Sequence, residues 1–439
     1  TTLLADIGVD LPLPEERIES EWLAVLDDVA KAVADITRKK HAVSADKIGR
    51  LRAVAGLGRD FIGSVSRAER SFDTFLAGTR QIVVGTCVGL GRSSLGLTAT
   101  AFDLVIVDEA ARCTAGELLV PLQAARWAVL VGDQAQLEPQ HKAEVVNLVA
   151  DRTKISKREI QRSDFERVFL TEYGRYAGAR LKTQYRMLPP IGQLVSESFY
   201  PDLALEAGRS VPIIPAQVLP EELEKPLIWI ETDGLGSAGH EQSVGSSRIN
   251  KAEADSLIGL LTKWHENETF RSWLQEQTTH QAGIGIISMY AAQRNLIDKA
   301  LRQSPLAYLL DRHIKIGTVD SYQGKENPII LLSLVRNNSA GPMEAGVKRI
   351  QEGFLATPNS INVAASRAMD RLVIIGARNR WREGGPMSLL SSSFSRRAAE
   401  GFAQEFAAEI LFGADEDTNR ADHPSSKPRR AGGGARGNA

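Results

Sequence analysis

Two short apolar segments that each end in acidic residues place the strongest constraint on the fold of this chain. Residues 102–107 lead directly into Asp108 and Glu109, and residues 127–131 lead into Asp133 after one glycine. Short runs rich in β-branched residues, separated by helical segments, are typical of buried parallel strands. Chemistry gathers at the carboxyl ends of such strands. The pattern therefore predicts an α/β sheet with a polar site at that edge.

Further strand candidates extend this pattern along the 439 residues. They are residues 81–85, 227–230, 284–288, 314–318, 329–333 and 371–375. Helical spacing of apolar residues separates several of them, as at 250–264 and 291–303. The strands after about residue 190 predict a second α/β domain.

Composition excludes several classes of protein. A net charge of -1 excludes a wholly basic nucleic-acid binder and still allows one local basic face. No apolar run reaches the roughly 18 residues of a membrane span, so we predict no membrane partner. Two cysteines, Cys87 and Cys113, cannot form a disulfide framework, which favours a reducing, cytoplasmic compartment. The histidines and cysteines show no zinc-ligand spacing.

The acidic strand ends have the residue types that magnesium-dependent phosphohydrolases use. Asp108 is suited to orient a metal and its waters, and Glu109 to polarise an attacking water. Gln136, close behind Asp133, is a neutral donor suited to contact a phosphate. A solvated strand end and an ordinary turn are the alternatives when each segment is considered alone.

Three later segments add cations and long polar side chains. Residues 184–187, Gln-Tyr-Arg-Met, contain Arg186, whose guanidinium geometry fits phosphate. Residues 318–326 contain Gly324, which allows close backbone approach, and long side chains suited to ribose or phosphate. Arg367 is the one cation in a helical, small-residue segment and is a candidate arginine finger. A surface arginine or a polar loop is the alternative for each.

Taken in order, these segments resemble the motifs of superfamily 1 helicases, and most closely those of the Upf-like branch. Residues 85–91 are similar to motif Ic, 107–111 to motif II, 132–139 to motif III, 163–167 and 181–187 to the segment leading into motif IIIa or IV, 318–326 to motif V and 362–368 to motif VI. Residues 284–293 are similar to a strand that ends in a Pro-Tyr-x-x-Gln turn. The likeness extends from about residue 80 to 380.

The resemblance implies an α/β fold of the RecA-like P-loop NTPase helicase core, with ATP between two RecA-like domains and single-stranded DNA or RNA across them. It implies a helical stalk or inserted subdomain at 1–79, the C-terminal half of RecA-like domain 1 at 80–187 and a complete domain 2 at 188–385. A C-terminal helix at 386–413 and a disordered tail at 414–439 complete the prediction.

The resemblance also implies a role for individual residues. The expected catalytic residues are Glu109 as general base, Gln136 at the γ-phosphate, and Arg186 and Arg367 as arginine fingers. The expected nucleotide-binding residues are Asp108, which holds Mg²⁺ through water, Asp133, Tyr185, Gly324, and Glu326 at the ribose. The residues expected near nucleic acid are Thr86, Tyr290, Thr318 and Ser321.

One departure from the family pattern bears on activity. The sequence GxxxxGK[ST], which cradles the phosphates of ATP, is absent from these residues. Together with a first residue that is not methionine, this absence favours the C-terminal part of an ATP-dependent helicase that is inactive alone. The alternatives are a non-hydrolysing nucleic-acid-binding scaffold and a split helicase whose P-loop lies on another chain. A nuclease fused outside these residues is a third hypothesis.

Overall fold

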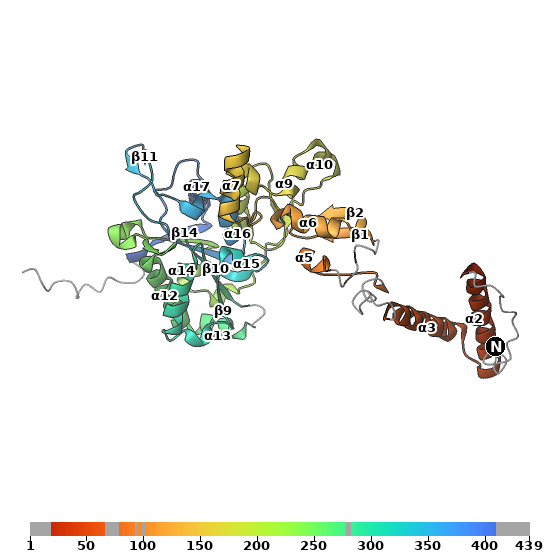
Figure 1. Cartoon of the computed structure of the whole chain (residues 1–439). Coiled ribbons are helices and arrows are strands. Elements are labelled where there is room, and N and C mark those ends of the chain that lie inside the picture. Colours follow the sequence, from red (N-terminus) through yellow and green to blue (C-terminus); the bar gives the residue numbers. More distant parts are fainter. Residues whose placement is uncertain are drawn as a thin grey trace, which may run out of the picture. The chain divides into compact units, whose positions relative to one another are not determined.

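The computed structural model describes residues 19–65, 79–92, 95, 97, 102–277 and 282–409. The chain divides into two compact units, Thr1–Val131 and Gly132–Ala439, which are described separately (Figure 1). The predicted domain boundaries remain predictions. The disordered tail predicted at 414–439 lies outside the described residues.

Unit 1 contains helices and one pair of strands. Its described elements are α2 (Glu19–His41), α3 (Ala45–Val65), α5 (Cys87–Leu90), β1 (Phe102–Val107), η3 (Ala110–Arg112), α6 (Ala115–Leu122) and β2 (Ala125–Leu130). β1 and β2 are parallel neighbours, as their apolar runs predict. The N–H of Val131 donates to the carbonyl of Val107, and the N–H of Ala110 donates to that of Val131, both at 2.8 Å. These bonds fix the turn that follows β1.

The strand predicted at 81–85 does not form. Within the described part of unit 1, these residues run as irregular chain into α5, and Ile82 and Val84 are 81% and 89% exposed. An apolar run becomes a strand only where a neighbouring strand accepts its backbone hydrogen bonds. β1 and β2 pair with each other, and the described residues offer 81–85 no strand partner.

Unit 2 is built on a six-stranded sheet that confirms the predicted α/β core. The strand order is β14-β5-β13-β10-β8-β9, and every neighbouring pair is parallel. The strands are β5 (Leu227–Glu231), β8 (Ile284–Ser288), β9 (Ile314–Thr318), β10 (Asn327–Ser333), β13 (Ala368–Gly376) and β14 (Ala403–Ala407). Five of the six follow apolar runs recognised in the sequence.

Helices cover both faces of this sheet. α11 (Pro189–Phe199), α16 (Pro358–Ala365) and α17 (Pro386–Ala399) pack on one face, and α12 (Lys251–Glu266), α13 (Glu268–Glu276) and α14 (Ala291–Arg302) pack on the other. Alternate residues of each central strand enter opposite cores. In β5, Leu227 and Trp229 lie in the first core, while Ile228 and Ile230 lie in the second. A strand buried on both faces needs the continuous apolar run that the sequence shows.

Shorter elements connect these layers. They are α7 (Ala143–Thr153), α8 (Lys157–Gln161), α9 (Asp164–Phe169), α10 (Glu172–Ala177), β3 (Thr183–Gln184), β4 (Glu206–Ala207), η4 (Ala216–Val218), η5 (Glu221–Leu223), η6 (Asp233–Gly239), β6 (Gln242–Val244), β7 (Ser247–Ile249), η7 (Ala307–Leu309), α15 (Val319–Tyr322), β11 (Met343–Glu344), β12 (Val347–Lys348) and η8 (Gly353–Ala356). Among the described helices, none combines the length and hydropathy that a membrane span requires.

The C-terminal helix is shorter than the predicted 386–413. α17 ends at Ala399, and β14 follows and pairs with β5. Gly401, at a φ of 83°, turns the chain between them in a conformation that favours glycine. The prediction failed because β14 is an edge strand that contains Gln404 and Glu405. These polar residues do not show the apolar run that marks a buried strand.

A buried carboxyl group holds the end of β10 in an unusual conformation. Glu253 of α12 is completely buried, and its Oε2 accepts from the Ser333 hydroxyl at 2.7 Å and the Val335 N–H at 2.8 Å. Val335 has a φ of 72°, a region that a β-branched residue rarely adopts. Burial, with a smaller contribution from the charge of Glu241, raises the pKa of Glu253 to about 8.

We expect Glu253→Gln to remove a pH dependence of the stability of unit 2. In the folded protein the pKa of Glu253 lies above its ordinary value of 4.5. The contribution of Glu253 to the free energy of unfolding is therefore complete below pH 4.5 and is lost as the pH rises toward 8. The neutral amide of glutamine does not titrate. Urea unfolding at pH 6 and pH 8.5 should therefore show a larger fall in midpoint for the parent chain than for the variant. An equal fall in the urea midpoint of the two proteins would contradict the role of Glu253 in this pH dependence.

Candidate nucleotide and nucleic-acid site

Asp108 and Glu109 form an exposed carboxylate pair directly after β1. Glu109 has a left-handed φ of 53°, and its N–H donates to Asp108 Oδ1 at 2.9 Å. The described residues contain no cluster of three or more metal-ligating side chains. Mg²⁺ at phosphate sites is commonly held by one or two carboxylates with waters and phosphates, so the Asp108 carboxylate fits the predicted metal.

Thr86, predicted near nucleic acid, is the N-cap of α5. Its hydroxyl oxygen accepts from the N–H of Gly89 at 3.1 Å, and the residue is exposed. The cap uses one lone pair and leaves the hydroxyl proton available to a phosphate oxygen.

In unit 2, the segment after Gly132 is held by its own side chains and by Tyr200. Gln136 Nε2 donates to Asp133 Oδ2 at 2.9 Å, and the Tyr200 hydroxyl donates to the same oxygen at 2.6 Å. Burial, and next the negative charge of Asp133, raises the pKa of Tyr200, so its hydroxyl remains a donor. These bonds fix the orientation of both predicted residues, Asp133 and Gln136.

Two asparagines of α16 bind the backbone of this segment. Asn359 Nδ2 donates to the carbonyls of Gln134 at 2.9 Å and Gln136 at 2.5 Å. Asn362 Nδ2 donates to the carbonyl of Ala135 at 2.8 Å. Sequence reasoning assigned no role to either asparagine, although Asn362 begins the segment that resembles motif VI. Their spacing of three residues on one helix, just before Arg367, was the available signal.

Arg367 follows α16 and contacts the predicted γ-phosphate residue directly. Its Nη2 donates to Gln136 Oε1 at 3.0 Å, and its Nε donates to the carbonyl of Val363 at 2.9 Å. The side chain is only 2% exposed. A buried guanidinium that is fixed in place offers a planar set of donors, which suits an anionic ligand such as a phosphate.

Arg186 lies close to Arg367 although the two residues are distant in sequence. Its Nε contacts Glu326 Oε2 at 2.5 Å, and its Nη1 lies 3.4 Å from the carbonyl of Ser366. The hydroxyl of Ser366 lies 3.3 Å from Arg367 Nη2, so both arginines touch this one serine. Glu326 and Arg367 precede β10 and β13, so the group lies at the amino edge of the sheet.

The backbone of Arg186 is fixed by side chains that the sequence analysis did not identify. Gln184 Oε1 accepts from the N–H groups of Arg186 at 3.0 Å and Met187 at 2.7 Å. Arg209 donates to the carbonyl of Arg186 at 2.6 Å and to Asp370 Oδ1 at 2.8 Å. No local motif marks Arg209 because its partners are distant in sequence. Tyr185, predicted at the nucleotide, is 70% exposed beside this loop.

The residues of unit 2 that are predicted near nucleic acid lie at the opposite, carboxyl edge of the sheet. Thr318 ends β9, level with Ser288 at the end of β8. Ser321 donates to the carbonyl of Thr318 at 2.9 Å. Tyr290 is only 5% exposed, and its ring lies 5.1 Å from that of Phe354. The predicted contact of Tyr290 with nucleic acid would use the small part of its side chain that is exposed.

Residues 318–326 connect the two edges. The last residue of α15 is Tyr322, which is buried and whose hydroxyl donates to Asn327 Oδ1 at 2.8 Å. A Cβ on Gly317 would lie 2.8 Å from the Tyr322 ring, so glycine permits this packing. Gly324, predicted to allow close approach, has a φ of 75° and turns the chain toward β10.

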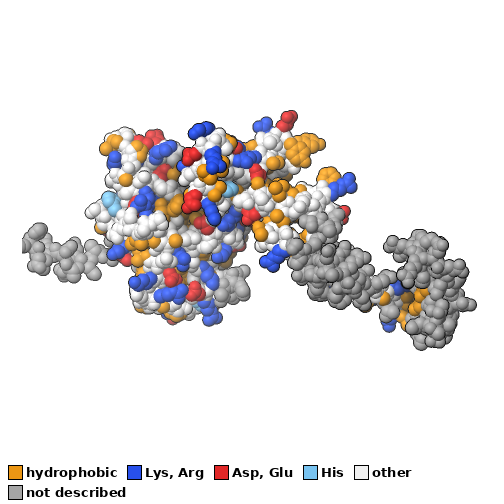
Figure 2. All heavy atoms as spheres, in the orientation of Figure 1, with side chains coloured by type: hydrophobic (Ala, Val, Ile, Leu, Met, Phe, Trp, Pro, Cys, Tyr) orange, Lys and Arg blue, Asp and Glu red, His pale blue; other side chains and the backbone are white. Residues whose placement is uncertain are grey.

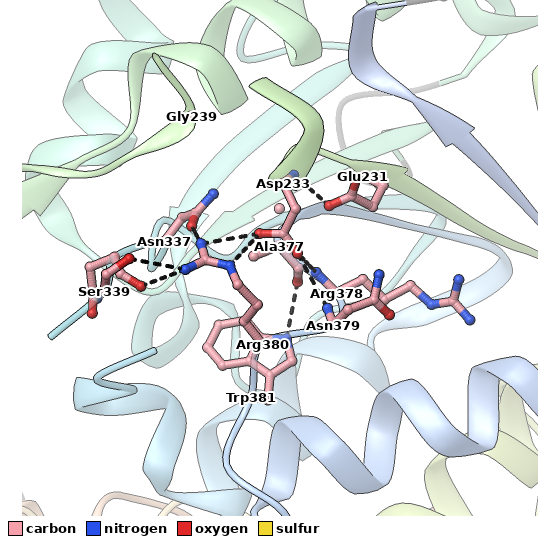
Figure 3. Close-up of polar contacts among 12 residues, drawn as sticks. Glu231, Asp233, Gly239, Asn337, Ser339, Ala377, Arg378, Asn379, Arg380 and Trp381 are labelled. Carbon is pink, nitrogen blue, oxygen red and sulfur yellow. Dashed lines mark hydrogen bonds and ion pairs between the residues drawn. The ribbon is translucent and has the colours of Figure 1, made fainter. Parts of the chain in front are cut away.

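Charged residues at the carboxyl ends of β5 and β13 bind one another (Figure 3). Asp233 Oδ1 pairs with the Arg380 guanidinium at 3.2 Å, and Asp233 Oδ2 accepts from the backbone N–H groups of Arg378 and Asn379 at 3.3 Å. Arg380 also donates to the Asn337 side chain after β10. This cluster ties three strand ends together and fixes the carboxyl edge.

Comparisons with known proteins identify the family of the chain. A family model described as an AAA domain matches residues 160–379, and a second AAA-domain model matches residues 16–144. The regulator of nonsense transcripts 1 homologues of Neurospora crassa and Arabidopsis thaliana are both 30% identical to the chain, over 67% and 70% of its residues. The ATP-dependent helicase NAM7 of Saccharomyces cerevisiae is 28% identical over 80%.

The aligned residues make up 24%, 22% and 33% of those three relatives, so the chain spans about a quarter to a third of their lengths. The two family models match residues of both units. The chain therefore belongs to the Upf-like branch of the superfamily 1 helicases.

Proposed function

We propose that this chain is the C-terminal part of an ATP-dependent helicase that couples ATP hydrolysis to movement along single-stranded DNA or RNA. The observation that carries the proposal is the group formed by Gln136, Arg186, Glu326 and Arg367. Arg367 donates to Gln136, and both arginines contact Ser366. Two cations, a neutral amide and a carboxylate are the groups needed to contact phosphoryl oxygens and a ribose.

Each residue of this group has a distinct role in the proposed reaction. Arg186 and Arg367 stabilise the negative charge that develops on the transferring phosphoryl group. Gln136 contacts the γ-phosphate through its amide, whose orientation is fixed by Asp133 and Arg367. Glu326 accepts hydrogen bonds from ribose hydroxyls.

The carboxylates of unit 1 supply the proton transfer and the metal contact. Glu109 accepts the proton of the attacking water, and its exposed carboxylate is accessible to that water. Asp108 holds Mg²⁺ through water. When bound, Mg²⁺ neutralises part of the phosphate charge. Thr86, Thr318, Ser321 and Tyr290 are the proposed nucleic-acid contacts.

A reducing, cytoplasmic compartment is part of the proposal. Cys87 and Cys113 are both free thiols, and burial raises the pKa of the Cys113 thiol to about 11. Two cysteines that form no disulfide are compatible with a compartment that keeps thiols reduced.

ATP turnover should depend on a phosphate-binding loop that these 439 residues lack. We expect residues 1–439 alone to show no single-strand-stimulated ATPase activity, because no P-loop lysine is present to hold the phosphates. A longer protein, in which the same residues follow an in-frame P-loop, should hydrolyse ATP faster when single-stranded DNA or RNA is added. A coupled ATPase assay of both proteins with poly(dT) and poly(U) tests this.

The same assay separates the proposal from its alternatives. Stimulated turnover by residues 1–439 alone would contradict the dependence on an added loop. Absence of turnover in the longer protein, with oligonucleotide binding intact, would favour the non-hydrolysing scaffold. Turnover that appears only when a second chain bearing a P-loop is added would favour the split helicase.

A further inference from the structure

We infer that the α9–α10 hairpin, residues 164–182, is a stacking site for the bases of single-stranded nucleic acid. The inference rests on the proposed function and adds a contact surface outside the motif residues. The hairpin belongs to unit 2 and consists of α9, α10 and the chain that leads to β3.

The hairpin exposes aromatic side chains to an unusual degree. Tyr176 is 90% exposed and Tyr173 is 70% exposed. They are three residues apart in α10, so their rings lie on one side of the helix. Leu170 and Val168, at 45% and 46%, add apolar surface nearby. Hydrophobic side chains gather visibly over α10 in the space-filling view (Figure 2). Exposed apolar surface of this kind marks a binding site more often than a single exposed residue does.

Two glycines allow the backbone that carries these tyrosines to pack closely against the preceding turn. A Cβ on Gly174 would lie 2.2 Å from the carbonyl oxygen of Val168, and a Cβ on Gly178 would lie 2.3 Å from the carbonyl oxygen of Gly174. The rings of Phe165 and Phe169 stack at 5.9 Å beneath the turn. The backbone that presents the tyrosines therefore packs closely on residues 168 and 169, and a packed support lowers the entropy lost on binding.

The surrounding segment is basic although the whole chain is not. Residues 152–182 contain nine Lys and Arg and four Asp and Glu, a net charge of +5, whereas the whole chain has -1. Three of those four carboxylates pair with Arg162 and Arg167. Among the described residues, Arg175, Arg180 and Lys182 have no carboxylate within salt-bridge distance. Cations that are not neutralised internally attract phosphates.

Two of these cations line a cavity beside the tyrosines. The cavity has a volume of about 260 Å³ and is lined by Phe169, Gly174, Arg175, Gly178 and Arg180. The Arg180 guanidinium lies over the Phe169 ring, 5.4 Å from its centroid, and this contact fixes its position. Arg175 belongs to α10 and lies between the two tyrosines in sequence.

The presence of exposed rings and of cations in one hairpin favours single-stranded nucleic acid over a protein partner. Each nucleotide of a single strand presents one aromatic face and one phosphate, and sites for such strands combine a basic surface with aromatic stacking platforms. Tyr173 and Tyr176 supply the platforms, while Arg175 and Arg180 supply the phosphate contacts. A protein surface that paired with the hairpin would need matching carboxylates close to apolar side chains.

Fluorescence anisotropy with residues 1–439 and fluorescein-labelled 20-nucleotide poly(U) and poly(dT) tests the site. Tyr173→Ser and Tyr176→Ser should each weaken binding about fivefold or more, because stacking on one aromatic ring contributes at least that factor. Tyr173→Phe and Tyr176→Phe retain the ring and should restore the affinity of the parent. The double variant Arg175→Gln/Arg180→Gln should reduce the slope of log affinity against log salt by about 1.4, the value for two single-strand phosphate contacts.

The matched control lies outside the hairpin. Tyr308 is 54% exposed and Arg312 is exposed, so the double variant Tyr308→Ser/Arg312→Gln removes the same side-chain types from another surface. We expect it to bind both oligonucleotides as the parent chain does, with each variant checked for an unchanged thermal midpoint.

Two results would overturn the inference. If the serine variants bind oligonucleotides as tightly as the parent, the hairpin is not the stacking site, while the proposed function still stands on ATP turnover of the longer protein. If the parent chain binds neither oligonucleotide, the stacking site is excluded, and the ATPase assay decides the proposed function independently. Equal weakening by the control variant would also count against the hairpin.

Discussion

Replacing Arg367 by alanine in the P-loop-bearing protein is expected to lower ATP turnover by about 10³- to 10⁵-fold, the range measured for arginine fingers. Arg367 is 2% exposed and donates to Gln136, so its charge is fixed before a phosphate arrives. A preorganised cation stabilises transition-state charge with no reorganisation during the reaction. The loss should therefore appear in kcat more than in the KM for ATP.

Arg367→Lys tests whether the planar shape of the guanidinium, and not only its charge, is required. Lysine keeps the positive charge but lacks the planar fork, so it cannot reproduce both the Val363 and the Gln136 contacts. We expect it to remain at least tenfold slower than the parent. Arg302→Gln, an exposed cation of α14, is the matched control and should turn over ATP normally. A kcat for Arg367→Ala within threefold of the parent, in a folded protein, would exclude the arginine-finger role.

Replacing Asp370 by alanine is expected to lower the free energy of unfolding of unit 2 by about 3–5 kcal/mol, the cost of breaking a buried ion pair from one side. Asp370 has no exposed surface. It accepts from Arg209 at 2.8 Å and from the backbone N–H groups of Ile213 at 2.5 Å and Ile214 at 2.8 Å. Alanine leaves one mostly buried cation and two N–H groups without their acceptor.

Urea unfolding of residues 1–439, followed by tryptophan fluorescence, measures this effect because four of the six tryptophans lie in unit 2. Asp370→Asn keeps an acceptor oxygen and should lose less stability than Asp370→Ala. Asp298→Ala, which removes an exposed pair with Arg302, should change the stability by no more than about 0.5 kcal/mol. An Asp370→Ala midpoint equal to that of the parent would show that the pair with Arg209 is not stabilising.

The central sheet was predictable because burial on both faces favours apolar side chains along most of each strand. β5, β8, β10 and β13 therefore contain continuous apolar runs that stand out in the sequence. β14 lies at the sheet edge and needs no such run, so its polar sequence gave no strand signal. Residues 81–85 show the converse, because an apolar run without a partner strand remains irregular chain.

Individual residues of the candidate site were predictable from the sequence, but the contacts between them were not. The family motifs identified Gln136 and Arg367, yet their contact joins residues 231 positions apart, which no local pattern predicts. The supporting side chains Tyr200 and Arg209 belong to no motif, and only the folded structure reveals what they hold. Supporting residues of this kind act through distant backbone carbonyls and carboxylates, so their identity depends on the tertiary structure.

The segment between Thr318 and Glu326 has a mechanical consequence. The strand registers place Thr318 about six residues, or about 20 Å along the strand direction, from Asn327. One turn of helix, the turn at residues 323–324 and two further residues connect these two points. The buried ring of Tyr322 anchors the middle of this connection. A change at Glu326 and a change at Thr318 therefore both act on the packing of one buried side chain.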